Sequence, residues 1–255
     1  MSDLTDTAAA IAGRIAERIW TGELLAGYRL PPERALAPHV GASRPTVRAA
    51  IRRLEHAGLV RVVRGRAGGA VVDGGAVPPE LLAPAASPLA TQDVHALLEA
   101  RRALEPAVAW LAAQHATPED LDALARLVRD LRDAPAVWEV HVLLDSRFHL
   151  GIARAAHNEA VWGLMKQLHI ELYRVRHRQL RRPHDPELLA AIHDRTLQAL
   201  VSGDRDRIER DLAEHLGWLE RAADPEPGGI RSWPATRSAA AAGRPGRAGG
   251  RPARP

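Results

Sequence analysis

The stretch SRPTVRAAIRRLEHAG, residues 43–58, indicates the fold of the first part of the chain. Its apolar side chains recur three and four residues apart, at Val47, Ala50, Ile51 and Leu54. This spacing predicts a helix with one apolar face. Ser43 is a residue type that accepts a hydrogen bond from the first helical turn, and Pro45 is tolerated in that turn. Gly58 suits the left-handed position that ends many helices, so both ends of the helix are marked.

Three arginines lie four residues apart in the same stretch. Side chains at this spacing share one face of a helix, so Arg44, Arg48 and Arg52 form a basic stripe opposite the apolar face. A stripe of this kind is either a solvated surface or a binding surface for a polyanion. The residues around the helix favour the second interpretation.

The neighbouring segments complete a small domain over residues 8–73. Apolar residues between positions 11 and 20 predict a first helix, and PERALAPHV, residues 32–40, predicts a short second one. LVRVVRGRAGGAVV, residues 59–72, predicts a β-hairpin with a basic tip. This order is that of a winged helix-turn-helix, in which one helix fits the major groove of DNA. The segment 44–66 holds seven arginines and one acidic residue, which supports DNA as the polyanion.

The composition limits the other classes of function. The length of 255 residues is enough for two domains. The sequence has no cysteine, which excludes disulfides, thiolate metal sites and cysteine nucleophiles. Its apolar runs fall short of the about 20 residues that a membrane span needs. The N-terminus MSDLTDTAAA does not resemble a secretion signal. We therefore expect a cytoplasmic protein without membrane contact.

The charge changes sign along the chain, although the net charge is +4. Residues 1–73 hold 11 arginines against 7 acidic residues, and residues 74–223 hold 18 basic against 22 acidic residues. Residues 224–255 hold 6 arginines against 2 acidic residues. Either basic end is suited to a polyanion. For the tail, the alternatives are added sequence-independent DNA affinity and a solvated segment without such a role.

The remainder of the chain is predicted to be helical up to its tail. Residues 74–90 are rich in Gly, Pro and Ala and are expected to be a linker. Residues 91–222 contain about six amphipathic segments joined by short turns, which predicts an all-α bundle. Residues 223–255 lack such periodicity and are expected to be a disordered basic tail. The expected fold is mainly α, with a winged helix-turn-helix followed by a helical bundle.

Two blocks of sequence match a known family. The first is LPPERALAPHVGASRPTVRAAIRRLEHAGLVRVVRGRAGGAVV, and the second consists of LLEARRALEPAVAWLAA, DSRFHLGIARAAHN and HDRTLQALVSGDRDRIERDLAEHL. In these blocks the chain resembles the GntR family of bacterial transcription regulators, in the subfamily whose C-terminal domain is the helical FCD domain. The resemblance covers residues 10–220. It implies the following DNA-binding residues: Arg34, Arg44, Thr46, Arg48, Arg64 and Gly65.

Two prolines depart from the pattern of the family. Pro32 stands where a small hydroxyl residue is usual before the Glu-Arg pair. Pro38 falls inside the predicted second helix, where it removes a backbone hydrogen bond. Both changes affect the helix that carries Arg34.

The helical part contains candidate metal ligands. Asp145 and His149 are four residues apart and share a helix face. Spacing alone leaves the ligand set open, because the chain has 12 histidines and His141 is also four residues from Asp145. Metal-binding FCD domains carry an Asp-x3-His pair and one histidine in each of the last two helices. The resemblance therefore implies the ligands Asp145, His149, His193 and His215. Three imidazoles and a carboxylate suit Zn²⁺, Ni²⁺ or Mn²⁺.

The resemblance also implies a ligand for this metal-containing domain. A small organic acid is expected to join the ion through its carboxylate. Arg101 matches a position near that effector, and a guanidinium pairs with a carboxylate through two parallel hydrogen bonds. Asn158 follows the Asp/His helix and is expected to line the pocket, the alternative being a plain turn at the C-terminal end of that helix.

The expected function is that of a ligand-responsive DNA-binding transcription regulator. We expect a repressor that binds a pseudopalindromic operator as a homodimer. A metal-responsive regulator without an organic effector is the first alternative. A metal-dependent hydrolase is the second alternative, but we find no separate general base at motif spacing. Since an enzyme also leaves the winged helix unexplained, we expect no enzymatic activity.

Overall fold

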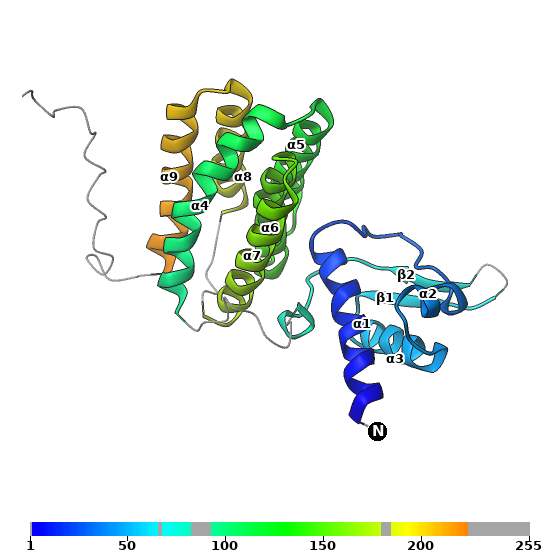
Figure 1. Ribbon diagram of the computed structural model, residues 1–255. Helices are drawn as coiled ribbons and strands as arrows, with labels where there is room; N and C mark the ends of the chain where they lie inside the picture. Colours follow the sequence, from blue (N-terminus) through cyan, green and yellow to red (C-terminus); the bar gives the residue numbers. More distant parts are fainter. Residues whose placement is uncertain (1, 66–67, 83–92, 180–184, 224–255) are drawn as a thin grey trace, which may run out of the picture. The chain divides into compact units, whose positions relative to one another are not determined.

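The computed structural model describes residues 2–65, 68–82, 93–179 and 185–223 (Figure 1). The tail that we expect to be disordered lies outside the described residues from position 224 onward. The described part is mostly helical, with a small sheet in its N-terminal region. The expected fold class, a winged helix-turn-helix followed by a helical bundle, is confirmed.

The winged helix consists of the elements predicted around the arginine stripe. In chain order they are α1 (Ser2–Trp20), α2 (Glu33–His39), α3 (Arg44–His56), β1 (Val60–Val63) and β2 (Gly69–Val72). The two strands are antiparallel, with Val60 opposite Val72. An isolated bridge joins Arg29 to Val71 and extends this ribbon by one residue of the α1–α2 connection. The hairpin therefore lies against the segment that precedes the helix-turn-helix.

The ends of α3 follow from its sequence. The Ser43 hydroxyl accepts a hydrogen bond from the backbone N–H of Thr46 at 3.3 Å, as expected of an N-cap. Gly58 has φ +71°, the left-handed conformation in which glycine avoids the steric cost of a Cβ atom. Val47 and Leu54 are fully buried and belong to the same core cluster as α1. These contacts fix which face of α3 remains outside.

The helix α2 shows the effect of both unusual prolines. Pro32 occupies the N-cap position, and no side chain caps this end of the helix. Pro38 lies one residue before the last residue, and the helix is only 7 residues long. Proline lacks the backbone donor that a longer helix needs at this position. The short α2 therefore agrees with the sequence.

The first part of the segment predicted as a linker packs against the core. It contains a short 3₁₀ helix, η1 (Pro79–Leu82), and buries Val77 and Leu82. The Tyr173 hydroxyl donates a hydrogen bond to the carbonyl oxygen of Val77 at 2.9 Å. The segment up to Leu82 is thus held by both parts of the protein, while residues 83–92 lie outside the described ranges.

The C-terminal part is a helical bundle. Its helices are α4 (Val94–His115), α5 (Pro118–Asp133), α6 (Trp138–Ala155), α7 (Glu159–Gln179), α8 (Pro186–Ser202) and α9 (Arg205–Ala223). Thr117 and Asp120 form a capping box at the start of α5, and Asp185 caps α8. The helix α6 packs against α4, α5 and α7, and α8 packs against α5 and α9. None of the described helices has the length and apolar character of a membrane span.

The helix α6 also contacts the winged helix. Arg147 donates hydrogen bonds from Nε to the carbonyl oxygen of Trp20 at 3.0 Å and from Nη2 to that of Ile19 at 2.7 Å. Carbonyl groups in the last turn of a helix have no partner within that helix. A second link joins Lys166 of α7 to Glu17 of α1 at 2.5 Å. The end of α1 is therefore tied directly to α6.

Gly151 allows α5 and α6 to approach closely, and Gly151→Ala is expected to destabilise the bundle. A Cβ atom at this position would lie 2.7 Å from Cδ2 of the buried Leu124. Overpacking of this kind lowers the free energy of unfolding by about 1–3 kcal/mol. Chemical denaturation measures the change. Gly163→Ala in α7 is the control, because its Cβ would meet nothing within 4 Å. Equal stability of Gly151→Ala and the unmodified protein would contradict the close packing.

Candidate metal centre and nucleic-acid interface

The four side chains proposed as metal ligands lie together inside the bundle. Asp145 and His149 come from α6, His193 from α8 and His215 from α9. One potential ligand atom from each lies within 4.8 Å of those of the others, and all four residues are buried. Four charged or polar side chains so close together are unusual in a buried helical core. A shared function, such as binding one ligand, explains their placement.

The three imidazoles are oriented by contacts on one ring nitrogen each. His149 Nδ1 lies 2.8 Å from Glu105 Oε2, and His193 Nδ1 lies 2.8 Å from the Leu189 carbonyl oxygen. Nδ1 of His215 lies 2.8 Å from the hydroxyl of Thr196. Metal-binding histidines in proteins are usually held in this way, with the second nitrogen left for the ion. Nε2 is therefore the ligand atom that His193 and His215 offer, whereas Nε2 of His149 also adjoins the guanidinium of Arg101.

The carboxylate of Asp145 adjoins two of these nitrogens. Its Oδ1 atom lies 3.2 Å from His193 Nε2 and 3.8 Å from His149 Nε2. Its Oδ2 atom accepts a hydrogen bond from Nη1 of the buried Arg176. His193 Nε2 has no hydrogen-bond partner among the described residues although it is fully buried. An unpartnered buried nitrogen is explained when a bound ion uses its lone pair.

The protonation states also fit a metal site. Burial lowers the pKa of His149 to about 4, and the nearby Arg101 acts in the same direction. Burial, followed by the charges of His193 and His149, lowers the pKa of His215. Burial raises the pKa of Asp145, but Arg176 and the neighbouring His193, His149 and Arg101 together hold that pKa well below its usual range. Neutral imidazoles and an ionised carboxylate are the forms that bind metal.

Arg101, the residue that the resemblance implied for the effector, lies beside His149 of the cluster. It is 1% exposed, donates from Nε to Glu105 Oε1 at 2.6 Å, and places Nη2 2.5 Å from His149 Nε2. Glu105 Oε1 also lies 3.0 Å from His169 Nε2. Glu105 thus holds both Arg101 and His149. Its position four residues after Arg101 is a signal that the sequence contained, since residues at this spacing share a helix face.

Two other predicted residues lie elsewhere. Asn158 is exposed, and its side-chain oxygen accepts hydrogen bonds from the backbone N–H groups of Ala160 and Val161 at 3.1 Å. The expectation that Asn158 lines the pocket is therefore corrected: this residue caps the start of α7. His141, the alternative partner of Asp145, bonds to backbone carbonyl groups instead and does not join the cluster.

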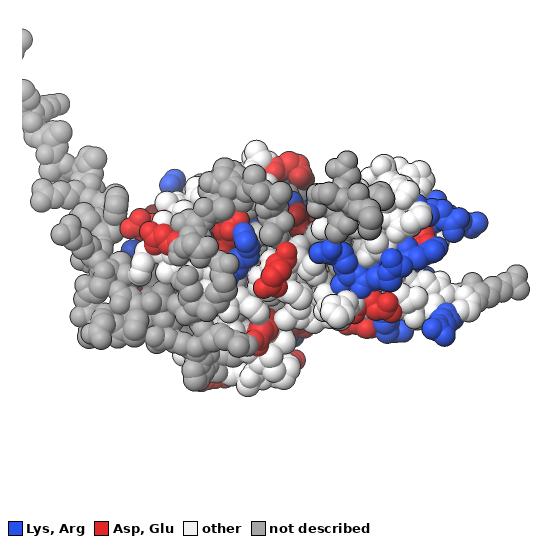
Figure 2. Space-filling model, turned by 90° about the horizontal axis from the view of Figure 1, so that it is seen from below, with Lys and Arg blue, Asp and Glu red and all other residues white. Residues whose placement is uncertain are grey.

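The exposed face of α3 carries the arginine stripe. Arg44, Arg48 and Arg52 are exposed, and Figure 2 shows basic side chains gathered over the winged helix. Glu33 at the start of α2 accepts the Nε–H of Arg48, shared between its two carboxylate oxygens, and a hydrogen bond from Nη2, at 2.6–3.1 Å. The hydrogen bond and charge of Arg48 lower the pKa of Glu33, so this carboxylate stays ionised and holds the guanidinium in one direction.

The remaining predicted DNA contacts differ in exposure. Arg34 on α2 is exposed, as are Arg64 and Gly65 directly after β1. Gly65 has φ +109°, which a residue with a Cβ atom rarely adopts. Thr46 is only 5% exposed, and its hydroxyl lies 2.7 Å from the hydroxyl of Ser43. In the structure Thr46 therefore belongs to the cap of α3.

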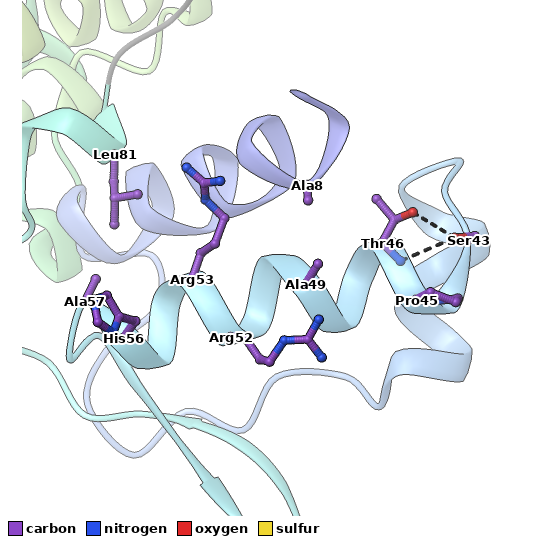
Figure 3. A pocket seen from close by; sticks show the side chains of 10 residues that line it. All are labelled: Ala8, Ser43, Pro45, Thr46, Ala49, Arg52, Arg53, His56, Ala57 and Leu81. Carbon is purple, nitrogen blue, oxygen red and sulfur yellow. Dashed lines mark hydrogen bonds between the residues drawn. The ribbon is translucent and has the colours of Figure 1, made fainter. Parts of the chain in front are cut away.

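A groove of 640 Å³ runs along the exposed side of α3 (Figure 3). Ala8 of α1 and Leu81 of η1 contribute to its wall. Its basic residues are Arg52, Arg53 and His56. In Figure 3, Arg53 rises from α3 on the side of α1. Arg53 was not among the predicted contacts, because it lies one position outside the stripe, yet it adds to the positive charge of this surface.

Comparison with known proteins gives matches to both parts of the chain. Residues 7–69 match the family described as bacterial regulatory proteins, gntR family, and residues 96–217 match the FCD domain. The chain is 30% identical over 222 residues to an Escherichia coli (strain K12) protein named as a regulatory protein of the L-lactate dehydrogenase operon. That match covers 82% of this chain and 83% of the relative.

Two further proteins are similar to the chain along most of their own length. The HTH-type transcriptional regulator LutR of Bacillus subtilis (strain 168) is 29% identical over 214 residues, which is 79% of this chain and 94% of LutR. A solved structure of Streptococcus agalactiae GntR is 25% identical with a TM-score of 0.45 and covers 86% of this chain and 99% of that one. The resemblance noted in the sequence is confirmed by the two family matches. The chain therefore belongs to the GntR family of bacterial regulatory proteins, with an FCD domain following its winged helix, and is a DNA-binding transcription regulator rather than an enzyme.

Proposed function

We propose that this regulator senses a small organic acid at the cluster of Asp145, His149, His193 and His215 while a divalent metal ion is bound there. The observation that supports the proposal best is the convergence of one nitrogen from each of three imidazoles and one carboxylate in a buried site. Zn²⁺, Ni²⁺ and Mn²⁺ all suit this donor set. A bound ion would supply a positively charged coordination position for a carboxylate.

Arg101 is suited to bind the acid itself. Its guanidinium lies beside His149 and is held by Glu105, so its direction is fixed before any ligand arrives. A fixed guanidinium pairs with a carboxylate at a lower entropic cost than a mobile one. The Escherichia coli relative is named for the operon of an enzyme that acts on lactate, which is a small organic acid. This name supports an organic acid as the class of ligand.

For DNA, we propose that two copies of the protein bind a pseudopalindromic operator in the cytoplasm. The α3 helix of each copy would enter the major groove with Arg44 and Arg48, and Arg34 and the wing residues Arg64 and Gly65 would contact the adjoining backbone or base edges. Thr46 would act indirectly on DNA binding, because it belongs to the cap that holds the start of α3. Arg52 and Arg53 would meet phosphates along the groove of Figure 3. We further propose that the acid releases the DNA, as in a repressor.

The helix α6 is the physical connection between the two activities. Asp145 and His149 belong to the ligand cluster, and Arg147 between them points away because residues two apart lie about 200° apart around a helix. On that other side Arg147 holds the last carbonyl groups of α1. A displacement of α6 by the ligand would therefore reach the winged helix. Coupling energies of this kind are typically about 1–3 kcal/mol.

Replacing Arg147 with glutamine is expected to disconnect the two sites. The variant should bind metal and acid normally, while the change in operator affinity caused by the acid falls from roughly 5–150-fold toward none. Calorimetry measures the binding of metal and acid. Fluorescence anisotropy with labelled operator measures the change in operator affinity. Arg132→Gln on α5 is the control, because Arg132 is exposed and pairs with Glu187. If the Arg147→Gln protein responds to the acid like the unmodified protein, α6 is not the connection.

The direct test of the proposed function uses the full chain purified under mild conditions. Mass spectrometry identifies the metal and any acid bound to it, and selection from random duplexes identifies the operator. Operator affinity is then measured with and without a panel of hydroxy and keto acids. Unchanged affinity with every acid would contradict the proposal. An affinity that changes on titration of metal alone would instead support the alternative, a metal-responsive regulator.

A further inference from the structure

Four charged side chains lie in or beside the ligand cluster, and all are buried. Arg101, Glu105, Asp145 and Arg176 are between 1% and 4% exposed. Arg101 pairs with Glu105 at 2.6 Å, and Arg176 pairs with Asp145 through Oδ2. Two positive and two negative charges therefore cancel within this part of the core.

A divalent ion changes this balance. The three imidazoles bind through neutral nitrogens, so they bring no charge that would compensate the ion. The site then holds two positive charges in excess in a region shielded from water. An uncompensated buried charge is strongly unfavourable, so a ligand that brings the opposite charge is selected. A monocarboxylate supplies one negative charge, and a dicarboxylate supplies two.

Arg176 on α7 has donors available for a second carboxylate. A guanidinium has five N–H donors. Arg176 uses Nη1 on Asp145, and its buried Nε has no hydrogen-bond partner among the described residues. Arg101 and Arg176 adjoin different ligand residues, since Arg101 lies against His149 and Arg176 against Asp145. The cluster is therefore flanked by two guanidinium groups.

We propose that the ligand of this site is a dicarboxylate on a short carbon chain, with one carboxylate beside the ion and Arg101 and the other held by Arg176. This inference rests on the proposed function, because it names the class of acid that the regulator senses. Arg176 is then the residue that distinguishes dicarboxylates from monocarboxylates. Its role follows from its unpartnered donor and from the charge balance of the buried site.

The test compares two pairs of acids that differ by one carboxylate. L-malate and L-lactate form the first pair, and succinate and butyrate form the second. Each is titrated into the metal-loaded full chain by calorimetry, and mass spectrometry verifies the metal content. The dicarboxylate of each pair is expected to bind at least about tenfold more tightly, as is typical when a buried charge gains a partner. Arg176→Gln should remove most of that difference, and both acids are compared at full metal content because Arg176 also bonds to Asp145.

Two further variants distinguish recognition of the second carboxylate by Arg176 from a structural effect of changing α7. Arg176→Lys keeps the positive charge beside Asp145 but has only one ammonium group for two carboxylates, so the preference for malate should fall while metal is retained. Arg174→Gln is the matched control on the same helix, because Arg174 pairs with Glu171. It should leave both affinities unchanged. Equal affinities within both pairs, or a preference that survives in both Arg176 variants, would overturn the inference while acid sensing stands. If no acid of either kind binds, the proposed function fails as well.

Discussion

The variant His193→Ala is expected to lose its metal. His193 is 0% exposed, and its Nε2 atom faces Asp145 without a hydrogen-bond partner among the described residues. Changing a residue that merely orients a metal ligand typically lowers metal affinity about 10–100-fold. Removal of a ligand itself should lower metal affinity by more than the upper end of that range. Competition with a chelator of known affinity measures the change, and elemental analysis gives the metal content after purification.

Loss of metal by His193→Ala could arise from the missing ligand atom or from a general loss of stability, and a control variant distinguishes the two causes. His141→Ala is a suitable control, since His141 is also buried and lies on α6. Its ring nitrogens lie 3.1 Å and 3.2 Å from the carbonyl oxygens of Val137 and Leu131. Losing these contacts should destabilise the protein by about 1–3 kcal/mol and leave metal binding intact. A His193→Ala protein that keeps one ion with unmodified affinity would refute the assignment of the ligands.

Replacing Arg44 or Arg48 with alanine should strongly weaken operator binding. A well-formed contact of arginine with a base contributes a discrimination of roughly 5–150-fold. Arg48 is directed by Glu33, and Arg44 stands at the first turn of α3. We expect each single variant to fall within that range and the double variant to bind operator and unrelated duplex about equally. Fluorescence anisotropy at several salt concentrations gives both quantities.

The salt series distinguishes contacts with bases from contacts with phosphates. Loss of one phosphate contact lowers the slope of log affinity against log salt by about one, whereas loss of a base contact removes sequence preference. Arg205→Ala on α9 removes the same charge from the helical domain, where Arg205 pairs with Glu209 on its own helix. Operator affinity that drops equally in the Arg205 variant would mean that net charge, and not α3, determines binding.

The elements of the winged helix could be predicted because their signals are local. The apolar spacing of Val47 and Leu54, the cap at Ser43 and the glycine at position 58 each specify one feature of α3, and all agree with the structure. The packing of Val77 was not predicted. A single apolar residue between glycines and prolines has no periodicity, and only the hydrogen bond from Tyr173 reveals its role.

The candidate site was predictable only in part, for a related reason. Spacing pairs Asp145 equally well with His141 and with His149, and the choice between them depends on how the helices rotate against one another. Arg176 had no distinguishing signal, because it lies among other basic residues in RVRHRQ. Its proximity to Asp145 arises from the packing of α6 against α7. Asn158 shows the opposite error, since a position implied by resemblance proved to be a helix cap.

The depth at which the ligand cluster lies has a consequence for the timing of the response. Asp145, His149, His193 and His215 are at most 5% exposed, so a molecule from solution reaches them only when neighbouring helices separate briefly. Association that waits for such an opening is slower than diffusion allows, and dissociation waits for the same event. A short pulse of ligand should therefore leave the site largely empty, whereas a sustained supply should fill the site and keep it filled. If the proposed acid is sensed at this depth, the regulator would respond to sustained rather than brief changes in its concentration.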